Sequence, residues 1–155
     1  ERRLMTRTFS LAVSFLLALQ PTLALACGPT PPKFDGNPET GVSISVGRIA
    51  DVIWVPLLLD GVPVPEDAGL SLMVTFDGKV SGTTGCNHFT GTADLDAGVM
   101  SFSPLAVTEV TCANPDAMQR EAAYLKALTE VRWFLAAPEG VWLTREDNSV
   151  VMCLW

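Results

Sequence analysis

The chain has 155 residues, enough for one domain of ordinary size with a single hydrophobic core. It carries 10 Lys and Arg against 17 Asp and Glu, and this acidic balance argues against nucleic acid as a partner. The hydrophobic fraction of 48% is raised by an apolar N-terminus.

Residues 1–26 have the pattern of an export signal. Three arginines precede an apolar run over residues 9–19, and a small-x-small cleavage site follows at residues 24–26. The run is too short to span a bilayer comfortably. Cleavage would leave 7 Lys and Arg against 16 Asp and Glu, a net charge of −9. We expect an exported protein of the periplasm or outer membrane, attached to a membrane only through this signal or a lipid anchor.

Two alternatives are open for Cys27, the first residue after the cleavage site. We expect a flexible linker rich in Pro and Gly over residues 27–45; in one alternative Cys27 is lipidated, and residues 28–41 tether the domain to a membrane. The cleavage motif of a lipoprotein is matched imperfectly, because Ala24 and Leu25 occupy positions where that motif prefers a large aliphatic residue and then a small one. In the other, Cys27 pairs with Cys153, since an oxidising compartment favours pairing of all four cysteines.

Alternating apolar residues and turn signals predict short strands from residue 42 onward. Leu70, Leu72, Val74 and Phe76 would share one face, and Asp77-Gly78 predicts a two-residue hairpin turn. The strands predicted before the first helix cover residues 42–46, 53–55 with 57–59, 70–76, from 80, 89–95, 99–102 and 105–110.

A single helix is predicted after residue 113. Asn114 is a good N-cap and Pro115 suits the first helical position. Helical spacing marks one face for burial, with Met118, Ala122, Leu125 and Leu128 or Thr129 on it. Three closing strands are expected over residues 131–135, 141–144 and 150–155, with the last two paired as a hairpin.

Residues 80–91 and the related segment over residues 108–112 are the most informative parts of the sequence about the fold. Gly82, Gly85 and Gly91 predict backbone angles that a Cβ would forbid, with Asn87 as the next most permissive residue. Cys86 and Cys112 lack the Cys-x-x-Cys spacing of a redox pair, so a structural disulfide is favoured. Closing a loop of roughly 26 residues would contribute about 3.5 kcal/mol.

Nine residues carry a family resemblance: Trp54, Gly82, Gly85, Cys86, Asn87, Phe89, Gly91, Thr108 and Cys112. With them, the chain from about residue 54 to its end resembles the META domain (HslJ-like) family. The resemblance implies a domain over residues 46–155 with a small, mainly antiparallel β barrel-like fold and one amphipathic helix packed against it, an α+β fold dominated by strands. It also implies an exported or envelope protein without established enzymatic activity.

Signs of catalysis or metal binding are weak. His88 is the only histidine, and no third or fourth ligand at a suitable spacing joins it and Cys86. Two acidic pairs, at residues 94 and 96 and at residues 146 and 147, fall at predicted turns, where acids are ordinary. We expect no catalytic residue, cofactor or metal.

The function expected from the sequence is binding. Strand edges and the turns around Asn87 would contact an unknown envelope protein or component, in a role that the family association connects with stress. The alternative is a carrier of a small apolar, lipid-like ligand inside the barrel. The tryptophans at residues 54, 133, 142 and 155 would line its pocket in that case, and would fill the core in the other.

Overall fold

The computed structural model describes residues 27–28, 30–34, 36 and 42–155. The predicted signal and its cleavage site lie outside the described residues. Within the described part, no helix combines the length and the hydropathy that crossing a membrane requires. The elements are η2 (Val46–Arg48), β1 (Ile53–Trp54), β2 (Pro56–Leu59), β3 (Val62–Pro63), η3 (Glu66–Ala68), β4 (Leu70–Val74), β5 (Lys79–Thr84), β6 (His88–Asp96), β7 (Val99–Phe102), β8 (Ala106–Val107), α1 (Pro115–Glu130), β9 (Trp133–Ala137), β10 (Gly140–Thr144) and β11 (Val150–Leu154).

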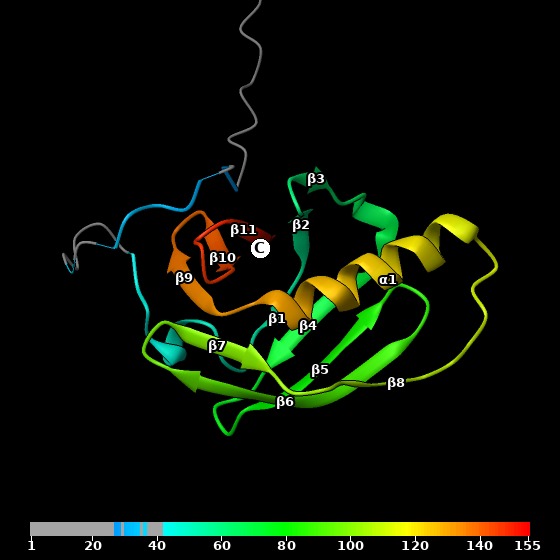
Figure 1. Ribbon diagram of the computed structural model, residues 1–155, viewed down its shortest axis with the longest axis horizontal. Coiled ribbons are helices and arrows are strands. Elements are labelled where there is room, and N and C mark those ends of the chain that lie inside the picture. The colour runs from blue at the N-terminus through cyan, green and yellow to red at the C-terminus, as the bar shows by residue number, and fades with distance from the viewer. Residues whose placement is uncertain (1–26, 29, 35, 37–41) are drawn as a thin grey trace, which may run out of the picture.

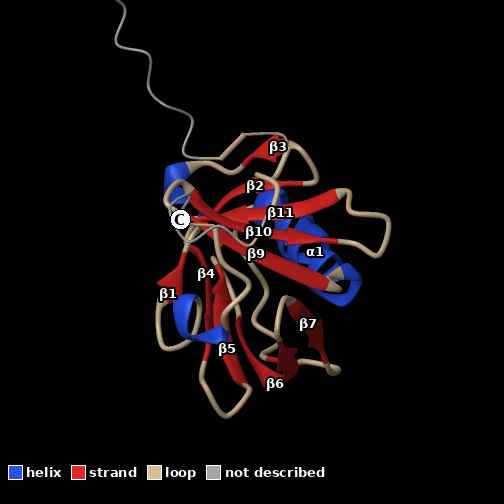
Figure 2. Ribbon diagram, turned by 90° about the vertical axis from the view of Figure 1, so that its left-hand side faces the viewer, coloured by secondary structure: helices blue, strands red, loops and turns tan. Residues whose placement is uncertain are grey.

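The strands form one antiparallel sheet in the order β1-β4-β5-β6-β7-β9-β10-β11-β2-β3, and β8 pairs with β6 beside this path. Only Val55 separates β1 from β2, although the two strands pair with different parts of the sheet. The backbone of Val55 exchanges hydrogen bonds of 2.8 and 2.9 Å with Trp155. The sheet therefore curls back on itself (Figures 1 and 2), which confirms the predicted barrel-like fold.

Helix α1 lies on the inner face of the curled sheet (Figure 1), where it contacts β5, β7, β11 and β2. Its start agrees with the sequence, because the Asn114 side chain accepts a hydrogen bond from Asp116 N–H at 2.9 Å. The predicted buried face is partly wrong. Tyr124, Ala127 and Leu128 are buried, whereas Met118 is 50% exposed. Ala122 is exposed as well, and the buried residues of the helix all lie in its second half.

The inner core is built around two aromatic rings. Phe89 and Tyr124 meet edge to face with their centroids 5.8 Å apart, and both are fully buried. Burial raises the pKa of the Tyr124 hydroxyl, which stays protonated and donates to the Ser71 carbonyl at 3.0 Å. Phe134 fills the same interior from β9. These side chains occupy the space that the ligand-carrier alternative requires.

Two of the motif glycines have a role that the sequence prediction missed. Gly85 has a φ of +85°, as expected, but Gly82 and Gly91 do not have positive φ. A Cβ at Gly82 would lie 2.1 Å from the Ser71 carbonyl oxygen and 2.4 Å from the ring of Phe89, its cross-strand partner. A Cβ at Gly91 would lie 2.6 Å from Leu105. These glycines therefore allow close approach of neighbouring backbone and side-chain atoms and not a special backbone angle.

A second, smaller cluster covers the outer face of β10 and β11. It contains Trp142, Ala137 and the disulfide between Cys27 and Cys153. The Trp142 indole N–H donates to the Gly28 carbonyl at 3.2 Å, which fixes the segment after Cys27 on the sheet. Because one face of β10 meets the core and the other meets this segment, the whole strand is buried.

Four predicted strands differ from the structure. Residues 42–46 form no strand: Ser43 pairs with Ala136 in an isolated bridge, the Ile44 carbonyl accepts from Gly98 N–H at 2.9 Å, and a 3-10 helix begins at Val46. Strand β4 ends at Val74, and Phe76 is 64% exposed in a turn that also includes Gly78. The apolar run over residues 53–59 is divided between β1 and β2. The strand expected over residues 105–110 is reduced to β8.

Candidate binding groove

The turn between β5 and β6 is held by hydrogen bonds between Thr84 and Asn87. Thr84 N–H donates to the Asn87 carbonyl at 2.8 Å, and Asn87 N–H donates to Thr84 Oγ1 at 2.9 Å. A Cβ at Gly85 would lie 2.0 Å from the Ala68 carbonyl oxygen at the end of η3. The turn is therefore packed closely against η3, and Asn87 is placed with only 2% of its surface exposed.

The side-chain amide of Asn87 takes the place of a neighbouring strand. Its Oδ1 accepts from Val110 N–H and from the Thr108 hydroxyl, both at 2.8 Å. Its Nδ2 donates to the Val110 carbonyl at 3.0 Å. A strand partner would bond both backbone groups of Val110 in the same way. The chain after β8 is thereby held against the turn, although no backbone ladder continues there.

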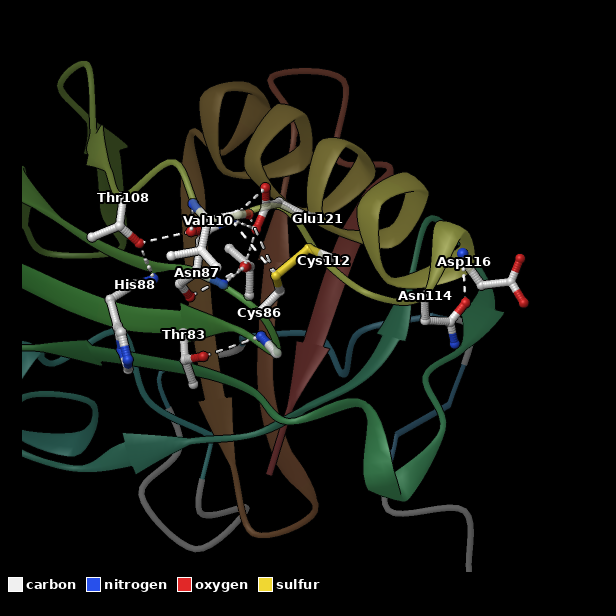
Figure 3. The surroundings of a disulfide bond; sticks show 12 residues. Thr83, Cys86, Asn87, His88, Thr108, Val110, Cys112, Asn114, Asp116 and Glu121 are labelled. Atoms are coloured by element: carbon white, nitrogen blue, oxygen red, sulfur yellow. Dashed lines mark hydrogen bonds between the residues drawn. A yellow bond between two sulfur atoms is a disulfide. The ribbon is translucent and has the colours of Figure 1, made fainter.

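Glu121 completes this network from α1. Asn87 Nδ2 lies 3.1 and 3.0 Å from the two carboxylate oxygens of Glu121, and the Thr84 hydroxyl donates to the same carboxylate. The two acceptor sites and two donors of the Asn87 amide are thus all used. We call Thr84, Asn87, Thr108, Val110 and Glu121 the Asn87 network; Figure 3 shows it beside a disulfide.

That disulfide joins Cys86 to Cys112, with a Cα–Cα distance of 5.8 Å, as the sequence predicts. It fixes the segment before α1 to the turn at one end, while the Asn87 network holds its other end. The two sulfur atoms and a carboxylate oxygen of Glu121 lie within 4.8 Å of one another. The sulfurs are bonded to each other here, so they are not thiolate ligands for a metal.

A groove of about 520 Å³ opens between this segment and α1. This volume is within the ordinary range for ligand sites. Asn87 and Glu121 line it, together with the apolar side chains of Val110 on one wall and Met118 on the other. Val110 is 62% exposed and Met118 is 50% exposed. The groove therefore combines a fixed polar network with apolar side chains that are accessible from solvent. Its lining residues are Asn87, Leu105, Val107, Thr108, Glu109, Val110, Thr111, Met118, Glu121 and Leu125.

The remaining sequence candidates lie outside the groove. His88 is exposed, and its ring points away from Glu121 in Figure 3. The acids at residues 94 and 96 are exposed on the β6–β7 hairpin. Asp147 accepts from Ser149 N–H at 2.9 Å, the ordinary turn-forming role, and hydrogen bonds from Ser149 lower its pKa.

The tryptophans do not converge on one pocket. Trp142 is buried in the outer cluster, and Trp54 packs against the inner core while donating to the Ile49 carbonyl at 2.8 Å. Trp133 and Trp155 are 41% and 56% exposed. These positions are consistent with packing roles for Trp54 and Trp142 and not with a shared ligand site.

Glu121 is a site residue that the sequence analysis did not single out. It occupies the same groove as Met118 and Leu125. Positions three and four residues apart share a helix face, so an acid between these two apolar residues was a usable signal. A carboxylate on an apolar face needs a polar partner, and here Asn87 is that partner.

A second groove, of about 490 Å³, lies between β3 and the first half of α1. Its walls include Val62, Pro63 and Arg120. None of the motif residues lines it, and neither disulfide borders it. The first groove is therefore the stronger candidate.

Comparisons with known proteins cover most of the chain. The model of the META domain family matches residues 48–154, which include the whole Asn87 network. A solved structure of a protein from Burkholderia xenovorans is 29% identical, with a TM-score of 0.57, covering 81% of this chain and 90% of that one. A second solved structure is 22% identical, with a TM-score of 0.52 and coverage of 66% and 86%, and shows the fold alone. No curated protein matches the chain.

Proposed function

Since this chain belongs to the META domain family, we propose that it is an exported, non-enzymatic domain that binds a protein or another component of the cell envelope. The groove between residues 105–111 and α1 is the proposed binding site. The observation that carries this proposal is the exposure of Val110 and Met118 above a fully hydrogen-bonded network. Exposed apolar side chains on a rigid base are typical of recognition surfaces.

Export is supported by two independent features of the chain. Residues 1–26 have the composition of an export signal, and all four cysteines are paired in disulfides. In the proposed mature protein, Cys27 is the first residue and forms its bond with Cys153. A sulfur in that bond cannot also carry the thioether lipid of a lipoprotein.

The intact mass of the protein from envelope fractions tests this part of the proposal. The expected mass is that of an unmodified chain beginning at Cys27 with two disulfides, found in the soluble envelope fraction. A diacyl or triacyl addition on Cys27 would instead show a lipoprotein and leave Cys153 without its partner. Mass and fractionation together therefore decide between the two states of Cys27.

The binding role is tested by photo-crosslinking in the native host. A photoreactive amino acid replaces Met118 in one variant and Glu139 in a control variant. Glu139 is exposed on the β9–β10 turn and does not line the groove. We expect a discrete crosslinked envelope component from position 118 and none from position 139. Equal crosslinking from both positions, or none from 118, would contradict the proposed site.

A contribution to stress tolerance belongs to the same proposal. A strain that lacks the protein should survive heat shock less well than its parent, and the wild-type chain should restore survival. A chain with Met118→Lys should fail to do so, because a charge on the groove wall opposes binding of an apolar group. Full rescue by Met118→Lys would separate stress tolerance from the groove.

A further inference from the structure

The outer edge of β8 faces the groove with an unpaired backbone. Thr108 N–H donates to the His88 carbonyl at 3.0 Å, so Thr108 directs its N–H toward β6. Antiparallel pairing alternates, and Ala106 therefore also faces β6 while Val107 directs its N–H and C=O to the other side. Among the described strands, none pairs with β8 on that side.

The groove has room beside this edge, and its opposite wall is a helix. Val107 lines the groove together with Met118 and Leu125 of α1. A free strand edge that faces a helix across a groove is a geometry in which extended peptides bind by adding a strand. Backbone hydrogen bonds then hold the peptide, and alternate side chains enter the groove.

The charge of the groove is negative. Glu109 and Glu121 both line it, and no Lys or Arg is among its lining residues. The chain after residue 26 is acidic as well, with 7 Lys and Arg against 16 Asp and Glu. This favours a segment that carries basic side chains, through both the encounter rate and the final contacts.

We propose that the groove binds an extended, basic segment of a partner protein, which pairs with β8 as an added strand. Its apolar side chains would alternate with Lys or Arg and pack against Met118 and Leu125. The inference rests on the proposed binding function, and it names the chemistry of the partner and its mode of binding.

The experiment uses the purified protein with both disulfides formed and a short peptide of alternating valine and lysine, about six residues long, the ordinary length of a strand. Binding is followed by amide NMR shifts. A second peptide has glutamate in place of lysine, and a third is N-methylated at alternate residues, which removes the backbone donors of one edge. We expect saturable shifts at Ala106, Val107 and Met118 with the lysine peptide. Both altered peptides should bind at least about tenfold more weakly, a difference of about 1.4 kcal/mol.

A matched pair of protein variants makes the same charge change inside and outside the groove. Glu109→Lys removes an acid from the groove, and Glu139→Lys reverses an exposed acid on the β9–β10 turn. Glu109→Lys should weaken the lysine peptide about tenfold, and Glu139→Lys should leave its affinity within about twofold. Equal weakening would show attraction to overall charge only and would overturn the groove assignment.

Two further outcomes test strand addition and the preference for a basic segment. If the N-methylated peptide binds as well as its parent, strand addition is wrong. If no lysine peptide binds up to about 1 mM, the basic-strand inference is wrong. In either case a crosslink from position 118 would keep the proposed binding function, whereas its absence would remove both.

Discussion

The two disulfides have similar Cα–Cα distances, 6.0 and 5.8 Å, but they lie in opposite surroundings. Cys27–Cys153 is buried among Trp142 and Ala137 in the outer apolar cluster. Cys86–Cys112 lies beside the polar Asn87 network at the border of the groove, and Figure 3 shows it there. One bond is surrounded by packed apolar side chains, and the other by hydrogen bonds.

This difference separates what holds the fold from what holds the site. The first bond closes a sequence separation of 126 residues and fixes the segment after Cys27 to two central strands. The second closes a separation of 26 and fixes one short segment beside the groove. Removing the first should therefore weaken the whole domain most, and removing the second should weaken it less but also change the groove.

The largest effect is expected from the double variant Cys27→Ala with Cys153→Ala. The chain-entropy model gives about 5 kcal/mol for a closed loop of this length. Since small domains are stable by only about 5–15 kcal/mol, this loss is a large part of the total. Urea unfolding of the variant and of the wild-type protein measures it. If removing Cys27–Cys153 lowers the free energy of unfolding by less than removing Cys86–Cys112 does, the expected difference between the two disulfides is wrong.

The second effect is that of Cys86→Ala with Cys112→Ala, for which the same model gives about 3.5 kcal/mol. Each single variant should lower the melting temperature by a similar amount, and the double variant should add little. Additive losses would show that the cysteines are not partners. The double variant should also bind the lysine peptide more weakly, whereas a folded Cys27→Ala, Cys153→Ala variant should keep its affinity.

The parts of the fold that the sequence predicted are those with local signals. Asn114 and Pro115 predicted the start of α1, and the strands predicted over residues 89–95 and 99–102 agree with the β6–β7 hairpin. Turn residues act within a few positions, so their effect can be read from the chain alone. The Cys86–Cys112 pair was also predicted, because the two cysteines lack the spacing of a redox pair and the chain was expected to be exported.

The parts that were missed depend on residues far apart in sequence. Ser43 meets Ala136 in a single bridge, which no alternation at residues 42–46 could reveal. A Cβ at Gly82 would meet the Ser71 carbonyl oxygen and the Phe89 ring, and those contacts exist only once β5 has paired with β4 and β6. In the site, Asn87 was expected to serve as a turn former. Its amide instead bonds Val110 and Glu121, residues 23 and 34 positions away.

The third effect concerns the network that distinguishes the two regions. Asn87→Asp places a second carboxylate beside that of Glu121, where Nδ2 now donates at 3.0 and 3.1 Å. We expect a loss of about 3 kcal/mol at neutral pH, because a buried donor is lost and two like charges meet. Like charges raise the pKa of the pair in the folded variant above its unfolded value. Stability should therefore be recovered below the unfolded pKa and lost as pH rises through the folded pKa.

The control for this experiment is Asn87→Ala, which removes the same hydrogen bonds but adds no charge. It should lose a similar amount of stability without the recovery on acidification. Unfolding in urea between about pH 4 and pH 7 compares the two variants, since carboxyl groups titrate near the lower limit. Identical pH profiles would show that Asp and Glu121 do not meet in the variant.

The smallest effects come from one substitution in each region. Asn114→Ala removes the N-cap of α1, and Trp142→Phe removes the indole N–H that donates to Gly28 at 3.2 Å. Each should cost about 1 kcal/mol in global stability. Their local effects should differ, and hydrogen exchange resolves them. Asn114→Ala should speed exchange in the first turn of α1, near Met118, and weaken peptide binding slightly. Trp142→Phe should leave the groove amides unchanged, and faster exchange there would show that the two regions are coupled.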